Sequence, residues 1–171
     1  MDEELLPGGN THAEIVRIGD TVRRPTGPWT PGVHALLRHL EGHDYASSPR
    51  VLGIDDRGRE ILTHIPGHVV WPDRFGLVQS DSGLSDVVGS IRSYHDAVAD
   101  FSRADEFVWW DHGRDPRSPM EIMCHNDLAP WNLIRRDDGG WTFIDWDLAA
   151  PGRRSWDVSW ALLSLVPLMP G

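Results

Sequence analysis

The spacing of apolar residues in the first third of the chain predicts a strand, strand, helix, strand, strand order. Branched apolar residues on both sides of a Gly-Asp turn predict a β-hairpin over 15–24. A helix is predicted over 31–41, with Thr30 as its N-cap and proline at its first position. Two further strands, 50–54 and 60–63, flank a turn rich in Asp and Gly.

The remaining two thirds of the chain begin with a segment, 65–83, that is rich in Gly, Pro, Asp and Ser and reads as a linker. The strongest periodic signal then predicts an amphipathic helix over 84–101, with one apolar face formed by Leu84, Val87, Val88, Ile91, Tyr94, Val98 and Phe101. Short strands are predicted over 121–124, 133–135 and 141–144. A last helix is predicted over 155–166, ending before Pro167.

Length and composition narrow the class of protein. The 171 residues suffice for one domain or two small ones with a real core. No apolar run approaches the roughly 18 residues of a membrane-spanning helix, and the first ten residues lack the pattern of a secretory signal. The single cysteine, Cys124, cannot form an internal disulfide, so we expect a cytoplasmic protein.

Charge separates this chain from nucleic-acid-binding proteins. The 26 acidic and 16 basic residues give a formal net charge of −10, the opposite sign to that of a nucleic-acid binder. All 16 basic residues are arginine, so a lysine cannot contact nucleotide phosphates here.

Two aspartates and an asparagine form the pattern that points to chemistry. Asn132 follows Asp127 by five residues, and Asp145 ends the strand thirteen residues further on. Transfer of a nucleotide γ-phosphoryl group needs a carboxylate to accept the proton of the attacking hydroxyl, and oxygen ligands for Mg²⁺. Asp127 can meet the first need, and Asn132 and Asp145 the second. His125 is expected to brace the loop through hydrogen bonds.

A predicted hairpin explains how the two metal ligands could meet. If 133–135 pairs with 141–144, the start of one strand lies beside the end of the other. Asn132 and Asp145 would then face the same cleft.

Residues 125–132 (His-x-Asp-x₄-Asn) and 144–147 (Ile-Asp-Trp-Asp) resemble the aminoglycoside phosphotransferase and choline kinase-like family, whose fold is related to that of protein kinases. Weaker support comes from 151–157, where the family often has an aspartate opening the next helix. The resemblance implies an α+β, protein kinase-like two-lobed fold, with a small antiparallel sheet lobe and a mainly helical, truncated C-terminal lobe. The small nucleotide-binding lobe would be 1–64, the hinge and linker 65–83, and the large lobe 84–171.

The resemblance also implies roles for individual residues. Asp127 would be the catalytic base, assisted by His125, with Asn132 and Asp145 as magnesium ligands. Asp157 would steady the catalytic loop. Asp147 is left open as a further metal contact or as part of an acidic substrate wall.

The chain departs from the family pattern in its phosphate-binding residues. The usual lysine is absent, and Arg23 or Arg24 is the natural replacement because a guanidinium binds phosphate oxygens in a bidentate fork. The paired glycines Gly8 and Gly9 could approach a phosphate through their backbone. The expected helix glutamate is also absent, and His34 lies near its place.

We therefore expect a small-molecule kinase that uses Mg²⁺ and ATP or GTP to phosphorylate a hydroxyl of a small acceptor. The expected acceptor is cationic, such as an aminoglycoside or a choline-like amine. The expected partners include neither nucleic acid nor membrane, and the apolar C-terminus could support a homo-oligomer. One alternative is a catalytically degenerate protein that binds nucleotide or a partner. Another is a metal-dependent phosphohydrolase that uses His95, Asp96 and His125.

Overall fold

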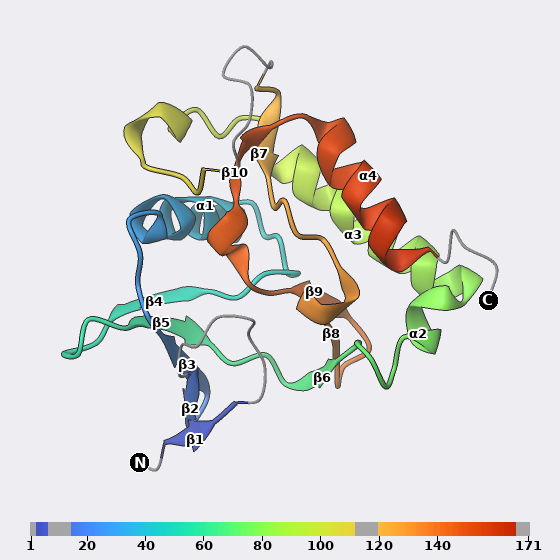
Figure 1. Cartoon of the computed structure of the whole chain (residues 1–171), viewed down its shortest axis with the longest axis horizontal. Coiled ribbons are helices and arrows are strands. Elements are labelled where there is room, and N and C mark those ends of the chain that lie inside the picture. The colour runs from blue at the N-terminus through green and yellow to red at the C-terminus, as the bar shows by residue number, and fades with distance from the viewer. Residues whose placement is uncertain (1–2, 7–14, 112–119, 167–171) are drawn as a thin grey trace.

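The computed structural model describes residues 3–6, 15–111 and 120–166, which form a small sheet lobe followed by a larger mixed lobe (Figure 1). The small lobe contains a five-stranded antiparallel sheet in the order β1-β2-β3-β5-β4, with one helix beside it. Its elements are β1 (Glu4–Leu5), β2 (Val16–Ile18), β3 (Thr21–Arg24), α1 (Thr30–Gly42), β4 (Val51–Ile54) and β5 (Glu60–Thr63).

The larger lobe combines two small antiparallel sheets with helices. One sheet has the order β6-β8-β9 and the other pairs β10 with β7. Its elements are β6 (Gly67–Val69), α2 (Gly76–Gln79), α3 (Asp81–Ala97), β7 (Ile122–Cys124), β8 (Leu133–Arg136), β9 (Trp141–Phe143), β10 (Ala150–Gly152) and α4 (Arg154–Leu165). Short 3₁₀ turns cover 104–106, 130–132 and 146–148.

The hairpin over 15–24, the first helix and the strands around the 55–58 turn are confirmed within a residue or two. The N-cap prediction is wrong. The capping position is Trp29, and the Thr30 hydroxyl instead accepts a hydrogen bond from the Gly27 backbone at 2.8 Å.

The segment predicted as a linker, 65–83, is more ordered than its composition indicates. It contains β6, which pairs with β8 far along the chain, and the short helix α2. Helix α3 also begins three residues before the predicted start, because Ser80 caps it by accepting a hydrogen bond from the Gly83 backbone. Composition could not reveal β6, since its pairing partner lies more than sixty residues away.

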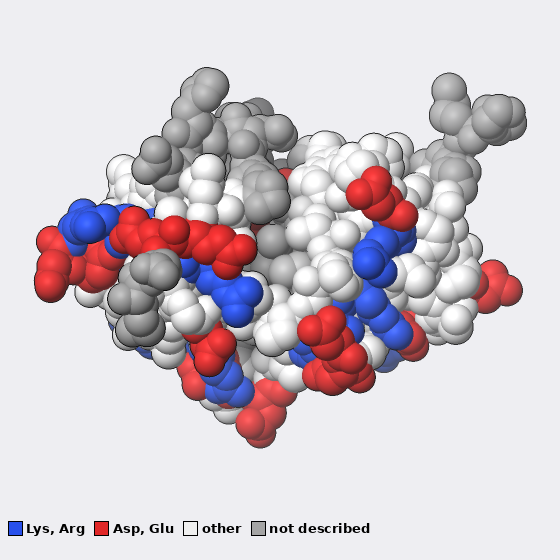
Figure 2. Space-filling view, turned by 90° about the horizontal axis from the view of Figure 1, so that it is seen from below, with Lys and Arg blue, Asp and Glu red and all other residues white. Residues whose placement is uncertain are grey.

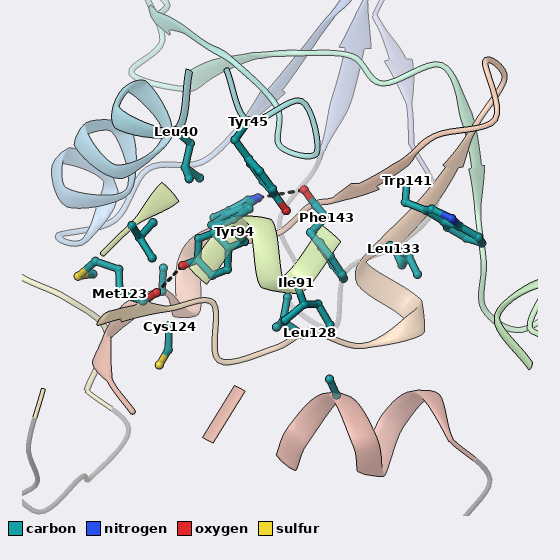
Figure 3. Packing of buried hydrophobic residues seen from close by; sticks show 14 of the residues in the cluster. Leu40, Tyr45, Ile91, Tyr94, Met123, Cys124, Leu128, Leu133, Trp141 and Phe143 are labelled. Carbon is teal, nitrogen blue, oxygen red and sulfur yellow. Dashed lines mark hydrogen bonds between the residues drawn. The ribbon is translucent and has the colours of Figure 1, made fainter. Parts of the chain in front are cut away.

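The core lies where α1, α3 and the strands of the larger lobe meet. Figure 3 shows Tyr94 of α3 within this cluster, donating a hydrogen bond to the Met123 backbone at 2.7 Å. Phe143 and Leu133 are also fully buried. Val88, which was predicted on the buried face of the helix, is instead 52% exposed. This core packs β7 and β9 against α3, and β8 pairs with β9. These strands carry the loops described below.

Charged groups on the molecular surface are mixed in sign. On the face drawn in Figure 2, acidic and basic side chains lie next to one another. Exposed ion pairs of the described residues include Arg57 with Glu3 and Arg103 with Glu106. Among the described residues, no helix has the length and apolar character needed to cross a membrane.

Candidate active site

The loop that follows β7 is hydrogen-bonded to Asp157, a fully buried residue in the first turn of α4. Its Oδ2 accepts hydrogen bonds from the His125 backbone at 3.0 Å and from His95 Nε2 at 3.1 Å. Its Oδ1 accepts one from the Asn126 backbone at 2.9 Å. Asn126 adopts a left-handed backbone conformation with φ of 66°, which Asn tolerates better than most residues. A buried carboxylate thus shapes the turn that presents Asp127.

Three side chains hold the Asp127 carboxylate. Its Oδ2 accepts hydrogen bonds from Asn132 Nδ2 at 2.7 Å and from Trp131 Nε1 at 3.1 Å. Its Oδ1 accepts one from Trp160 Nε1 of α4 at 2.9 Å. The carboxylate is therefore oriented from both sides, while the residue stays partly exposed.

The β8–β9 hairpin brings Asp145 back towards Asn132, as predicted. Leu133 lies opposite Phe143 in the register, and the Ile144 backbone donates to the Asn132 carbonyl at 2.9 Å. Asp145 follows at once, with φ of 61° and its side chain half exposed. Because the Asn132 amide nitrogen points to Asp127, its amide oxygen points away from that carboxylate.

Arg24, at the end of β3, lies against the acidic groups of the larger lobe. Its Nη1 donates to Asp145 Oδ1 at 3.0 Å, and its Nη2 donates to Asp147 Oδ1. Its Nε pairs with Glu60 Oε1 at 2.5 Å. Arg24 as a whole residue is 9% exposed, and its three carboxylate partners keep its pKa above the ordinary arginine value despite its burial.

Glu60 supplies the carboxylate that we expected from the first helix. It lies on β5 directly opposite Arg24 in the β3–β5 register, and it is buried. Its Oε2 lies 2.8 Å from Nε2 of His34 on α1. Glu60 on β5 therefore links Arg24 of β3 to His34 of α1. Sequence reasoning missed Glu60 because only the strand pairing puts it beside Arg24.

Of the two candidate arginines, the structure brings only Arg24 to Asp145. Arg23 belongs to the opposite face of β3, where it donates to the Thr21 hydroxyl at 2.5 Å and pairs with Asp55 at 3.8 Å. Gly8 and Gly9 lie outside the described residues.

His125 is a fully buried part of this loop. Its Nδ1 accepts a hydrogen bond from the Asp127 backbone at 3.3 Å, and its ring packs 4.4 Å from that of Trp146. Burial lowers the pKa of His125, and the negative charges of Asp157, Asp127 and Asp145 oppose this shift. The imidazole is therefore neutral near pH 7, which suits a bracing role.

Asp147 has the opposite behaviour. Burial raises its pKa to about 6, although the charge of Arg24 lowers it, while the negative charges of Asp145 and Glu60 raise it further. The two aspartates flanking Trp146 thus differ: Asp145 is exposed and Asp147 is largely enclosed.

The oxygen donors beside Asp127 suit Mg²⁺. Carboxylate and amide oxygens, which Asp145 and Asn132 present, are the hard ligands that this ion prefers, usually with several waters retained. The guanidinium of Arg24 already places positive charge against Asp145 and Asp147. A metal ion would therefore share Asp145 with the guanidinium or displace it from that carboxylate.

The phosphohydrolase alternative is not supported by the placement of its residues. His95 is bonded to Asp157, whereas Asp96 faces solvent near Arg92 and Arg154. Over the described part of the chain, these residues and His125 do not form a group of metal-binding atoms.

Comparisons with known proteins agree with the fold and the motifs. Residues 84–168 match the family model described as the phosphotransferase enzyme family. The chain is 34% identical over 164 residues to a trifolitoxin immunity protein of Rhizobium leguminosarum bv. trifolii, and the match covers 94% of this chain and 61% of that protein. The chain thus spans about three fifths of the length of that curated relative.

Solved structures share the fold at low sequence identity. A choline/ethanolamine kinase family protein from Mesorhizobium loti has a TM-score of 0.63 and 18% identity, covering 95% of this chain and 64% of that one. An aminoglycoside phosphotransferase from Alicyclobacillus acidocaldarius has a TM-score of 0.65 and 14% identity, covering 95% and 67%. A spectinomycin phosphotransferase in complex with ADP and spectinomycin has a TM-score of 0.56 and 12% identity, covering 92% and 67%.

The architecture is therefore the protein kinase-like two-lobed fold that the resemblance implied. The region matched by the family model, residues 84–168, contains both the loop that carries Asp127 and the strand end that carries Asp145. Residues 84–168 thus resemble the phosphotransferase enzyme family in sequence, and the chain shares its fold with choline/ethanolamine kinase and aminoglycoside phosphotransferase structures.

Proposed function

We propose that this protein transfers the γ-phosphoryl group of ATP or GTP to a hydroxyl of a small molecule. The observation that carries the proposal is the bond between Asp127 and Asn132, together with the hairpin contact that returns Asp145 to Asn132. A carboxylate that can accept a proton thus adjoins two oxygen donors suited to Mg²⁺. The ADP bound to a phosphotransferase of the same fold supports a nucleotide donor.

Each residue then has a defined task. Asp127, oriented by Trp131, Trp160 and Asn132, would accept the proton of the attacking hydroxyl. Mg²⁺, held by Asn132 and Asp145, would neutralise charge on the phosphates.

Arg24 would take the place of the family lysine. In the structure its guanidinium is shared among Glu60, Asp145 and Asp147. With nucleotide bound, phosphate oxygens would replace Asp145 at Nη1 and Asp147 at Nη2, while Glu60 keeps its bond to Nε. The fork geometry of arginine suits this bidentate contact.

A cationic acceptor fits the electrostatics. The chain has a formal net charge of −10, and Asp127, Asp145 and Asp147 lie close to the site of transfer. We therefore propose an amine-bearing hydroxyl compound as the acceptor, in line with the choline/ethanolamine kinase family protein and the spectinomycin phosphotransferase that share the fold.

The test is the Asp127→Asn variant, assayed for ADP release with a panel of hydroxyl amines. Loss of a general base lowers turnover by about 10² to 10⁴. Nucleotide binding, followed by thermal shift with MgATP, should change little. Unchanged turnover in this variant would overturn the assignment.

A second candidate function is binding without phosphate transfer. Two observations favour it: Arg24 spans both metal-side aspartates, and the curated relative is an immunity protein, a name that describes protection rather than catalysis. In that case MgATP or a toxin would stabilise the protein, and no acceptor in the panel would promote ADP release. The two functions are thus separated by the same pair of assays.

A further inference from the structure

A group of metal-binding side chains lies away from the cleft, where the C-terminal end of α1 meets the turn after α3. It consists of His39, His43 and Asp100, whose ligand atoms all lie within 4.8 Å of one another. Over the described residues it is the only such group of three. Neither the family pattern nor the proposed function uses these residues.

Local structure explains the arrangement. His39 lies in the last turn of α1 and His43, four residues on, is its C-cap, so both rings lie on one side of the helix end, with ring centroids 4.4 Å apart. Asp100 comes from the turn that follows α3 and points to both rings. The ring of His39 packs edge-on against Phe101, with 5.1 Å between centroids, which limits its rotation.

The two distances from Asp100 to the histidines are close to those between ligands of a tetrahedral metal centre. Asp100 Oδ1 lies 3.1 Å from Nε2 of His39 and 3.4 Å from Nε2 of His43. Ligands about 2.0–2.1 Å from a tetrahedral zinc ion are roughly 3.3 Å apart. A cation could thus enter with small side-chain movements.

The chemistry of the three groups favours a first-row transition metal. Two imidazoles and one carboxylate are typical ligands of Zn²⁺, whereas Mg²⁺ and Ca²⁺ prefer all-oxygen sites. Without a metal, His39 Nε2 donates to the Ala97 carbonyl at 2.9 Å. A metal bound at His39 Nε2 would replace the proton on that nitrogen, so the hydrogen bond to the Ala97 carbonyl would be lost.

The surroundings leave room for a fourth ligand. His39 and Asp100 line a cavity of about 910 Å³ between α1 and the segment 100–107. His43 and Asp100 are exposed, with 41% and 68% of their side chains accessible. A metal with three protein ligands could therefore keep a water or a small anion on the side of the cavity.

We propose that His39, His43 and Asp100 form a binding site for Zn²⁺ or a similar divalent transition metal. Such a centre would join the end of α1 to the end of α3. It does not depend on phosphate transfer, because none of the three residues contacts Asp127, Asn132 or Asp145 in any described interaction.

The test uses the chain as purified, stripped of metal with a chelator and then titrated with ZnCl₂ by calorimetry. We expect one equivalent of Zn²⁺ per chain and a higher melting temperature in the presence of the ion. His43→Gln and Asp100→Asn, both at exposed positions, should each weaken binding at least tenfold, since even outer-shell losses typically cost about 10–100-fold.

The matched control is His68→Gln, which removes an exposed histidine of β6 outside the cluster and should leave the affinity unchanged. Circular dichroism confirms that each variant is folded. Absence of a stoichiometric site, or equal affinity in the wild type and both cluster variants, would overturn the proposal and leave only ion pairs between the histidines and Asp100.

Discussion

Replacement of Asp157 by Asn should destabilise the whole protein, although the residue touches neither substrate nor solvent. Its carboxylate accepts three hydrogen bonds, from two loop backbone N–H groups and from His95. An amide of the same shape offers one oxygen and one NH₂ group, which must face a donor. At least one buried donor therefore loses its partner.

The structure sets the magnitude. Hydrogen bonds to charged groups contribute about 1.5–3 kcal/mol each, and breaking a buried ionic network typically costs about 3–5 kcal/mol. We expect the free energy of unfolding to fall by about 3–5 kcal/mol. For a domain of this size that corresponds to a fall in melting temperature of about 6–20 °C.

Urea denaturation of the wild type and Asp157→Asn at pH 7 measures the change directly. The matched control is Asp96→Asn on α3, whose side chain is 67% exposed and lies 3.8 and 3.9 Å from its arginine partners. It should cost less than about 0.5 kcal/mol. A loss below about 1 kcal/mol for Asp157→Asn would refute the view that this carboxylate supports the loop.

The remaining predictions concern the residues around the cleft. Glu60→Gln should lower the free energy of unfolding by about 3 kcal/mol, the low end for a broken buried ion pair, because Arg24 keeps two other acidic partners. The control Glu41→Gln, at an exposed position, should change the free energy of unfolding by under about 1 kcal/mol, and equal urea midpoints for the two variants would contradict the prediction. Trp160→Phe removes one donor to Asp127 and should slow turnover about 10- to 100-fold without weakening nucleotide binding, as measured by steady-state kinetics and thermal shift; an unaffected rate would show that the bond does not position the carboxylate. Because burial raises the pKa of Asp147 to about 6, from 3.8 in the unfolded chain, the stability that this group contributes should fall as pH rises from about 4 to about 6. Urea midpoints across this range should show that fall in the wild type relative to Asp147→Asn, and parallel curves would argue against the shift.

Local sequence patterns predicted many of the helices and strands. Apolar spacing located α1, α3 and α4, and turn residues located the hairpins, because both signals depend on residues only a few positions apart. The same locality explains why the sequence could place Asn132 beside the strand end at Asp145. A single hairpin with a Gly-containing turn sets that register.

Contacts between distant segments could not be predicted in this way. The sequence by itself determined the elements, the acidic charge and the Asp127, Asn132 and Asp145 pattern. Tertiary structure decided that Arg24 faces the cleft while Arg23 faces away, and that Glu60 on a neighbouring strand takes the place of a helix acid. It also brought the α4 indole of Trp160 to the Asp127 carboxylate, and Asp100 to the histidines of α1. Each of these partners becomes a neighbour only when strands pair and helices pack, because burial of the shared core fixes their relative positions.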